Sequence, residues 1–373
     1  MNSHCWKLAD LRSVEPNGCT VFSTFACGGG STMGYKLAGF HVVGANDIDP
    51  EMAEVYRANL DPDHYYLKPI GDLVKELRLG VVPDHLRDLD ILDGSPPCSS
   101  FSMGGARDRD WGKEKRFREG QANQVLDDLF FDYLNLVEIL QPRAFVAENV
   151  TGILIGKAKG YAKAIVQRAR AMGYSVQVFE FDAAACGTPQ SRRRVFFIGT
   201  REKCPKLVFS PSLRVVGQAE ACSGLALDPS DVERATLKPG STMRKYWDAT
   251  EVGRYFSDSH PKGSLYTWKK NNPAKPVATI VASYVNQCHG HEPRKFTWKE
   301  LLRLGSFPDD YDLCEPNRAK WNEKACYLVG MSVPPPMIRE LSSAIFSQWL
   351  GTASRWENLT GEKATRQPVD PMA

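Results

Sequence analysis

The chain has 373 residues, with 42% hydrophobic and 24% charged side chains and a formal net charge of +3. This composition is typical of a folded globular protein and excludes a wholly disordered or collagen-like chain. No apolar run approaches the ~18 residues of a membrane span, so we expect a cytoplasmic protein that does not bind membranes. Ten cysteines are scattered without a Cys-x-x-Cys pair, and we therefore expect no structural metal site.

Strand and helix patterns alternate through the first 200 residues. Short β-rich stretches predict strands at 20–26, 40–45, 89–92, 144–147, 174–181 and 195–198. Helices are predicted at 31–39, 50–60, 124–140 and 158–172. Such alternation predicts a parallel sheet with helices on both faces. We therefore assign this part to the α/β class, with a doubly wound and mostly parallel sheet.

The pattern changes after residue 200. Segment 201–280 is rich in turn residues, has no long helical period and carries scattered Trp, Tyr and Lys, which indicates a second, smaller domain. Residues 201–300 hold 16 Lys and Arg against 10 Asp and Glu. This excess favours contact with an anion, nucleic acid being the leading candidate, although a solvated surface can carry the same pattern. Helical periodicity returns at 297–304 and 337–350.

A glycine-rich turn, Phe25-Ala26-Cys27-Gly28-Gly29-Gly30, follows the first strand. Glycine lets the main chain approach a ligand, and the helix that follows offers free N–H groups. Asp47, at the end of the next strand, is placed to hold the hydroxyls of an adenosine ribose. The pattern alone leaves nicotinamide, flavin and S-adenosylmethionine open, and a turn without a ligand is the alternative. Asp72, near a predicted strand end, suits a ligand contact or a helix N-cap equally well.

Two prolines fix the main chain directly before Cys98, in Gly94-Ser95-Pro96-Pro97-Cys98. The carboxyl edge of a parallel sheet holds the chemistry, and a cysteine on a rigid turn there can have a lowered pKa and act as a nucleophile. Glu148 follows the strand at 144–147 at the same edge, where it can donate a proton; an ordinary loop acid is the alternative. The loop 104–120 between them is polar and basic, which suits a lid over an anionic substrate.

Three arginines precede the strand at 195–198. Arg192, Arg193 and Arg194 can hold a phosphate or a carbonyl oxygen, although a charge run is more often a solvated face. Cys288-His289-Gly290-His291 invites a zinc interpretation. Two histidines and a cysteine within four residues are too compressed for the usual zinc spacing, so we do not assign a metal there.

These motifs, in this order, resemble the DNA (cytosine-5) methyltransferase family of bacteria and phages. The resemblance covers about 20–200 and 294–350, and its most specific part is Pro-Pro-Cys98 followed 50 residues later by Glu148-Asn149-Val150. It implies a Rossmann-like methyltransferase fold with a second, smaller target-recognition domain. The implied catalytic and cofactor-binding domain is 1–200 plus 328–352, the recognition domain with its hinge is 201–327, and 353–373 is a tail.

The resemblance also implies a role for each site residue. Catalysis is assigned to the nucleophile Cys98, the proton donor Glu148, and two arginines that grip the base, Arg192 and Arg194. The cofactor S-adenosylmethionine is expected to contact Phe25, Gly28, Gly30, Asp47, Ile48, Asp72, Leu73, Pro97 and Ser332. Double-stranded DNA is expected to contact Ser99, Arg107, Arg109, Lys238, Arg244, Lys245, Lys269 and Lys270. The stretch from Arg294 to Glu300 resembles the motif that braces the recognition domain.

The implied reaction moves a methyl group from S-adenosylmethionine to C5 of a flipped-out cytosine in a specific duplex sequence, through a covalent Cys98 adduct at C6. We expect a monomer that lies on the nucleoid when bound to DNA, with a cognate restriction endonuclease as a candidate partner. Two alternatives stay open: a cytosine-5 methyltransferase that acts on tRNA, as in a eukaryotic branch of the family, and a catalytically inactive DNA-binding relative. A Rossmann oxidoreductase has no role for the Pro-Pro-Cys98 and Glu148 motifs.

Overall fold

The computed structural model describes residues 4–97, 114–115, 124–125, 129–156, 158–202, 204–210, 214–265 and 267–351. Its centre is a seven-stranded sheet in the order β3-β2-β1-β4-β7-β9-β8. The strands are β1 (Thr20–Thr24), β2 (His41–Asp47), β3 (Tyr65–Leu67), β4 (Ile91–Gly94), β7 (Ala144–Val150), β8 (Ser175–Asp182) and β9 (Arg193–Thr200). The first five are mutually parallel, and β9 runs antiparallel to β7 and β8. The predicted α/β class with a mostly parallel sheet is therefore confirmed.

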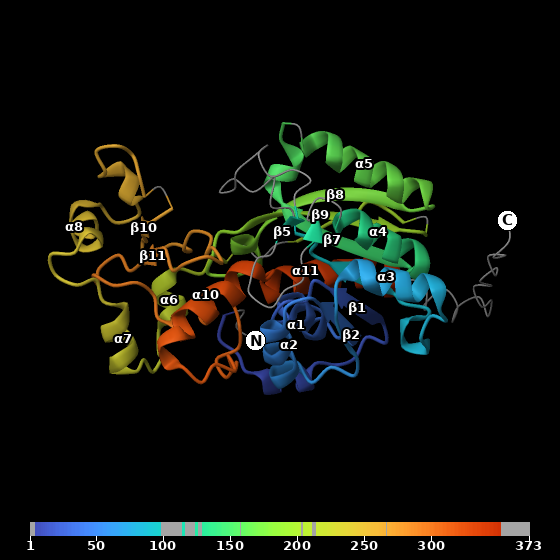
Figure 1. Ribbon diagram of the computed structural model, residues 1–373, viewed down its shortest axis with the longest axis horizontal. Helices are drawn as coiled ribbons and strands as arrows, with labels where there is room; N and C mark the ends of the chain where they lie inside the picture. Colours follow the sequence, from blue (N-terminus) through green and yellow to red (C-terminus); the bar gives the residue numbers. More distant parts are fainter. Residues whose placement is uncertain are drawn as a thin grey trace.

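Helices cover both faces of the sheet (Figure 1). Adjacent strand residues point to opposite faces: Phe22 packs in the core with α3, α4 and α5, whereas Val21 packs in the core with α1 and α11. The helices around the sheet are α1 (Gly30–Leu37), α2 (Pro50–Leu60), α3 (Ile70–Leu79), α4 (Leu129–Leu140), α5 (Ala158–Ala171), α9 (Trp298–Leu304), α10 (Trp321–Met331) and α11 (Pro335–Ile345). Among the described residues, no helix has the length and apolar character needed to cross a membrane.

Three features differ from the predicted elements. The helix predicted at 124–140 begins at Leu129, and Gln124–Val125 instead forms the short strand β6, paired with β5 (Glu114–Lys115). β3 was not predicted because three residues are too short to show a period. α3 and α10 were not predicted either, and α10 carries polar residues such as the buried Lys324 along its apolar stripe.

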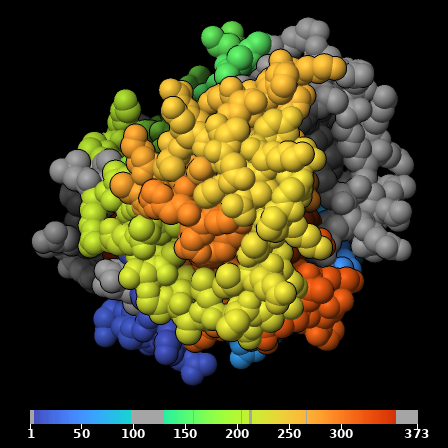
Figure 2. Space-filling view, turned by 90° about the vertical axis from the view of Figure 1, so that its left-hand side faces the viewer, coloured from blue at the N-terminus to red at the C-terminus, as the bar shows by residue number. Residues whose placement is uncertain are grey.

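The segment after β9 forms a lobe at one end of the molecule, on the left of Figure 1. Its elements are short: α6 (Gln218–Cys222), α7 (Pro229–Ala235), α8 (Thr242–Ala249), β10 (Lys269–Lys270) and β11 (Gln287–Cys288). The lobe has its own small core, formed by Leu237, Trp247, Phe256 and Cys288. Figure 2 looks onto this end, where the yellow and orange segments make up most of the visible face. We call residues 214–296 the recognition lobe, after the role that the resemblance predicts for this part of the chain. That role and the predicted domain boundaries remain a proposal, and the predicted tail lies outside the described residues.

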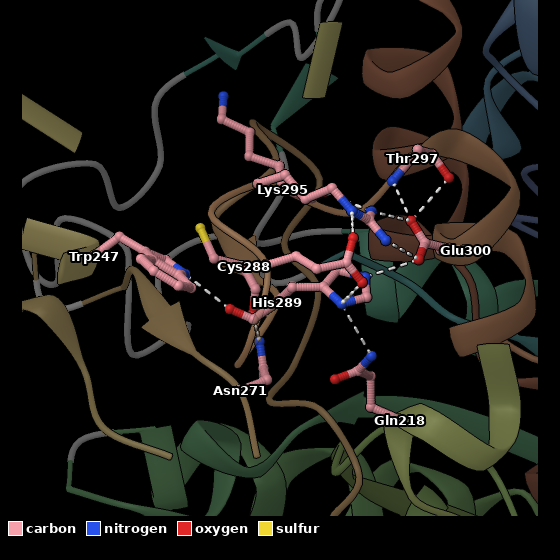
Figure 3. A network of polar contacts seen from close by, with 10 residues as sticks. Gln218, Trp247, Asn271, Cys288, His289, Lys295, Thr297 and Glu300 are labelled. Atoms are coloured by element: carbon pink, nitrogen blue, oxygen red, sulfur yellow. Dashed lines mark hydrogen bonds and ion pairs between the residues drawn. The ribbon is translucent and has the colours of Figure 1, made fainter. Parts of the chain in front are cut away.

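A buried polar network ties the recognition lobe to α9 (Figure 3). Glu300 accepts hydrogen bonds from Arg294 at 2.7 and 3.0 Å and meets His289 Nε2 at 2.8 Å. Gln218 lies 3.4 Å from His289 Nδ1, and the Trp247 indole donates to the His289 carbonyl at 2.8 Å. Burial opposes the ionisation of Glu300, but the bonds from His289 and Arg294 outweigh it and lower its pKa to about 2. The network thus gives His289 a structural role, and the described residues contain no group of three or more ligands that could hold a metal.

Candidate active site

The carboxyl ends of β1, β4 and β7 lie side by side at one edge of the sheet. The chain runs from β1 to β2 in one direction along the sheet and later places β4 on the other side of β1, so the strand order switches there. Open α/β sheets bind ligands at such a switch point. The glycine-rich turn leaves β1 here, the Pro-Pro turn leaves β4, and Glu148 follows Ala147, the β7 partner of Gly94. The structure therefore brings these three predicted motifs to one edge.

The turn after β1 holds unusual main-chain angles. Phe25 and Cys27 have φ of 54° and 45°, in the left-handed region that favours glycine, and Gly29 caps α1 with φ of 83°. The Cys27 N–H donates to the Asp47 carboxylate at 2.7 Å, which helps to hold this conformation. Backbone strain of this kind clusters at ligand sites. Phe25 is half-buried against the core, which leaves part of its ring free to stack on a ligand.

Close packing leaves little room for a side chain at Gly28 and Gly30. A Cβ on Gly28 would lie 1.9 Å from Leu328 on α10, and one on Gly30 would lie 2.4 Å from the Val333 carbonyl oxygen. The Tyr311 hydroxyl also donates to the Gly28 carbonyl. Residues from the C-terminal part of the chain therefore pack against the turn and hold its position. This is a structural reason for both glycines, and their cofactor contact stays a prediction.

Asp47 uses both carboxylate oxygens at the end of β2. Oδ2 accepts from the Cys27 N–H at 2.7 Å, and Oδ1 accepts from the Asp49 N–H at 2.8 Å. The Ile48 N–H is a third main-chain donor to this carboxylate, and because a carboxylate has about four lone-pair sites, one site is left for a ribose hydroxyl. Burial raises the pKa of Asp47 to about 6, against the lowering effect of these main-chain bonds. The carboxylate is therefore fixed in place and still has capacity for a ligand.

Four other predicted cofactor residues differ in exposure. Ile48 and Pro97 are half-buried at the edge of the sheet. Leu73 is fully buried in the core, so only its main chain can reach a ligand. The hydroxyl of Ser332, beside Gly30, is buried and interacts with the Cys27 thiol, so its contact with a cofactor stays a prediction.

Asp72 lies in the first turn of α3, shortly after the end of β3 at Leu67. The N-cap position belongs to Pro69, so Asp72 is not the cap. Its carboxylate pairs with Lys75 at 3.0 Å, and both side chains are more than half exposed. An exposed pair contributes little to stability, so this contact leaves the acid available for the predicted role.

An ion pair between Glu148 and Arg194 lies at the edge of the sheet. Arg194 Nε is 2.7 Å from Glu148 Oε1, and the two side chains are only 13% and 11% exposed. Burial lowers the pKa of the Arg194 guanidinium, and the Glu148 charge opposes that effect. The next residue, Asn149, donates from Nδ2 to the Pro96 carbonyl at 3.1 Å. The end of β7 is thereby fastened to the turn that leads toward residue 98.

Arg192 is held by carbonyl groups of other segments. It donates to the Gly330 carbonyl at 2.7 Å and to the Ile280 carbonyl at 3.4 Å, while its buried Nε has no partner. Arg192 therefore ties the β9 edge to α10 and to the chain near residue 280. We carry Arg194 forward as the arginine most directly placed to contact a base beside Glu148.

The predicted nucleophile lies beyond the described residues. Cys98, Ser99, Arg107 and Arg109 all lie after residue 97, outside the residues that the structure describes. Their roles stay predictions, supported at the site by the placement of their neighbours Pro96 and Pro97.

The predicted DNA contacts on the recognition lobe have unequal surroundings. Lys238 and Lys245 are exposed, and Lys269 is half-buried. Arg244 pairs with Asp248 one turn along α8, at 2.9 Å. These four remain candidates for DNA contact.

Lys270 is buried inside the lobe. Its ammonium donates to the Trp247 carbonyl at 3.0 Å and lies 3.7 Å from the centre of the Trp247 ring. A phosphate would have to displace both interactions to reach it. We therefore interpret Lys270 as a structural cation of the lobe and do not carry it forward as a DNA contact.

A buried carboxyl group, Asp93, lies beneath the site and was not predicted. It is 2% exposed on β4, where Ser23 donates to it at 2.9 Å and Tyr35 at 3.2 Å. Burial raises the pKa of Asp93 to about 7, the hydrogen bonds lower it, and the charge of Glu148 raises it further. Asp93 lies five residues before Cys98, so a proton on this group changes the charge directly under the site.

Replacement of Asp93 by asparagine should change how stability depends on pH. Because its folded pKa lies above the unfolded value of 3.8, the native state binds the extra proton, and wild-type stability should fall as the pH rises through 7. In D93N this pH dependence is absent. The free energy of unfolding of D93N relative to wild type should therefore rise by about 2 to 3 kcal/mol between pH 5 and pH 8. Urea unfolding at both pH values measures the difference. D258N, which removes an exposed carboxylate, is the control. If the stability of D93N depended on pH in the same way as that of wild type, the raised pKa of Asp93 would be contradicted.

Several residues of the site escaped sequence reasoning. Asp93 could have been noticed as an acid inside an apolar strand. Tyr311 and Tyr327, which bond to Gly28 and Asp49, come from segments far along the chain. Their sequence neighbourhood gives no hint of these partners.

The chain was also compared with known proteins. A family model described as C-5 cytosine-specific DNA methylase matches residues 19–220 and 229–347. The Type II methyltransferase M1.HphI of Haemophilus parahaemolyticus is 26% identical over 339 residues, covering 87% of this chain and 86% of that protein.

Two solved structures share the fold. A DNA modification methyltransferase encoded within an E. coli prophage has a TM-score of 0.66 at 20% identity, covering 89% of this chain and 99% of that one. DNMT2 of Spodoptera frugiperda has a TM-score of 0.62 at 17% identity, with coverage of 88% and 100%. At such identities the likeness concerns the fold, and the family match is the broader finding because it spans every motif described above.

Proposed function

The chain belongs to the C-5 cytosine-specific DNA methylase family, and we propose that it methylates C5 of a flipped-out cytosine in a specific double-stranded DNA sequence, with S-adenosylmethionine as cofactor. As a member of this family it is a DNA (cytosine-5) methyltransferase. The observation that carries the detailed proposal is the buried Glu148–Arg194 pair, fastened through Asn149 to the turn that precedes Cys98.

Cys98 is the proposed nucleophile. Cytosine C5 is a poor nucleophile, and a thiolate that adds to C6 converts the ring to an enamine with higher electron density at C5. S-adenosylmethionine, when bound, supplies the methyl group that C5 receives. Loss of the C5 proton and departure of the Cys98 thiolate then restore the aromatic ring. Sulfur suits both steps because it attacks well and leaves well.

Glu148 and Arg194 are proposed to balance the charge that this addition creates. Thiolate addition places negative charge on the ring, and a protonated Glu148 can relieve it by donating to N3. Arg194 is proposed to hold the O2 carbonyl, and its Nε, which pairs with Glu148, supports this assignment. In a half-closed, low-dielectric site such preorganised groups stabilise developing charge more strongly than water does. Because a base in a duplex is out of reach of these groups, the cytosine has to leave the stack.

The residues around the β1 turn fit S-adenosylmethionine. Asp47 is proposed to accept from the ribose hydroxyls, and the Ser332 hydroxyl, beside Gly30, is proposed to supply a further polar contact. Phe25 and Ile48 offer half-buried apolar surface for the adenine.

Replacement of Asp47 by alanine should raise the dissociation constant for S-adenosylmethionine by roughly tenfold to over a hundredfold, because a hydrogen bond to a charged acceptor contributes ~1.5–3 kcal/mol. Wild-type affinity should also fall as the pH drops through about 6, where the carboxylate takes up a proton. Calorimetric titration between pH 5 and pH 8 measures both effects, with E54Q on the exposed face of α2 as control. An unchanged constant in D47A would exclude Asp47 as the ribose ligand.

The proposed function is tested by bisulfite sequencing of DNA from a host that expresses the protein. We expect 5-methylcytosine at one short sequence context and none in a host without the gene. A parallel assay with unmodified tRNA tests the RNA alternative, and methylation of tRNA without methylation of duplex DNA would overturn the proposal. We further propose that the enzyme acts as a monomer and that a cognate restriction endonuclease shares its target sequence, in keeping with the Type II relatives.

A further inference from the structure

The recognition lobe contains a cavity of about 330 Å³ with cations on its walls. Arg254 comes from the turn after α8, Lys269 from β10 and Lys275 from the loop that follows. Of these three, only Lys269 was predicted from sequence as a DNA contact. A concave surface with three positive side chains is a natural site for an anion.

The positive charges of this cavity are not neutralised by the protein. Among the described residues, no carboxylate lies within ion-pair distance of Arg254, Lys269 or Lys275. The Lys269 ammonium lies 4.8 Å from the centre of the Tyr255 ring, and burial together with the charge of Lys275 lowers its pKa. Arg244 of the same lobe differs from these three cations because it forms an ion pair with Asp248. Like charges gathered without a counter-ion are relieved when an anion binds.

The cavity is connected to the catalytic edge through the main chain. Lys275 is two residues from Val277, whose N–H donates to the Pro189 carbonyl at 3.0 Å and whose carbonyl accepts from the Ser191 N–H at 2.9 Å. Ser191 directly precedes Arg192 in the arginine motif. The segment that carries Lys275 is therefore held by main-chain hydrogen bonds to the segment that leads into the arginine motif of the catalytic edge.

The polar amides of the cavity are occupied by the protein. Asn271 Nδ2 donates to Gln287 at 2.9 Å and to the Cys288 carbonyl at 3.0 Å, and Asn272 Oδ1 accepts from the Ala274 N–H. Asn271 is therefore poorly placed to read base edges, and the three cations are the groups of the cavity that suit an anion. Cations of this kind contact phosphate oxygens and carry no sequence information directly.

We propose that this cavity binds a backbone phosphate of the DNA substrate through Arg254, Lys269 and Lys275, and that it contributes affinity that is independent of sequence. The proposal rests on the proposed function, because it assigns a part of the substrate that the enzyme methylates. It adds Arg254 and Lys275 to the substrate contacts and separates phosphate binding from the residues that read the bases.

The test is the salt dependence of duplex binding in R254Q, K275Q and the double variant, with K262Q as a matched control. Lys262 is an exposed lysine of the same lobe and does not line the cavity. Because the cavity is proposed to bind one phosphate, loss of that contact in the double variant should reduce the slope of log K against log salt concentration by about 0.9, and each single variant should lose part of that amount. Unfolding midpoints equal to wild type show that each variant is folded. The methylated sequence, mapped by bisulfite sequencing, should be unchanged.

Two outcomes would overturn the assignment. Slopes in R254Q and K275Q that match K262Q would show that the cavity holds no phosphate. A methylated sequence relaxed at one position would show that these side chains read a base instead. Failure of the proposed function is distinguished by the wild-type enzyme, which in that case methylates no duplex DNA at all.

Discussion

Replacement of Cys98 by alanine should abolish methyl transfer, by several orders of magnitude, while DNA binding stays close to wild type. The physical reason is that no other group can form the bond to C6 that activates C5, whereas the phosphate contacts lie elsewhere on the protein. Methyl incorporation from labelled S-adenosylmethionine and a duplex-binding titration measure the two effects separately. The Cys5→Ala variant, which removes an exposed cysteine of the protein, is the control and should keep full activity.

A duplex that contains 5-fluorocytosine extends the test to the covalent step. After methyl transfer, the fluorine at C5 cannot leave as a proton does, so the bond between Cys98 and C6 cannot be released. The wild-type enzyme should therefore form a complex that survives denaturation, and the C98A variant should form none. Turnover by C98A would rule out the covalent mechanism, and so would a trapped complex that forms without Cys98.

The order of the sheet could be predicted because each element carries a local pattern. α2 begins at Pro50 because Asp49 accepts from two N–H groups of its first turn, and that signal is written in adjacent residues. The Pro-Pro turn and Glu148 could be placed at one edge because the carboxyl ends of parallel strands meet there. Sequence reasoning succeeded wherever a role depends on neighbours along the chain or on a rule of sheet topology.

Roles that depend on distant partners could not be predicted. Lys270 looked like a surface cation, yet Trp247 buries it, and no local pattern records that contact. Gly28 looked like a glycine that lines a ligand site. In the structure it also faces the side chain of Leu328, 300 residues away, which crowds any Cβ at that position. Asp93 gains its raised pKa from burial among side chains of three different elements. In each case the deciding contact joins segments that the sequence keeps far apart.

Exchange of the recognition lobe should move the target sequence of the enzyme. The roles proposed for Cys98 and Glu148 apply to any flipped cytosine, so these residues carry no information about neighbouring bases. Each good bidentate base contact gives ~1–3 kcal/mol of discrimination, and a few such contacts suffice for a short target. A relative that receives the lobe should therefore methylate the sequence of the donor, as bisulfite sequencing of the chimera's DNA would reveal.

The structure decides where the exchanged segment should end. A graft of 201–280, the segment that the sequence delimits, would separate β10 from its partner β11 and remove Cys288 from the core of the lobe. A graft of 201–296 keeps both strands together and also carries His289 and Arg294, which meet the glutamate at the position of Glu300. We expect the longer chimera to fold and adopt the donor's target, and the shorter one to lose stability or activity. If the longer, folded chimera keeps the recipient's target, the bases are read outside the lobe, and the loop 104–120 becomes the next segment to exchange.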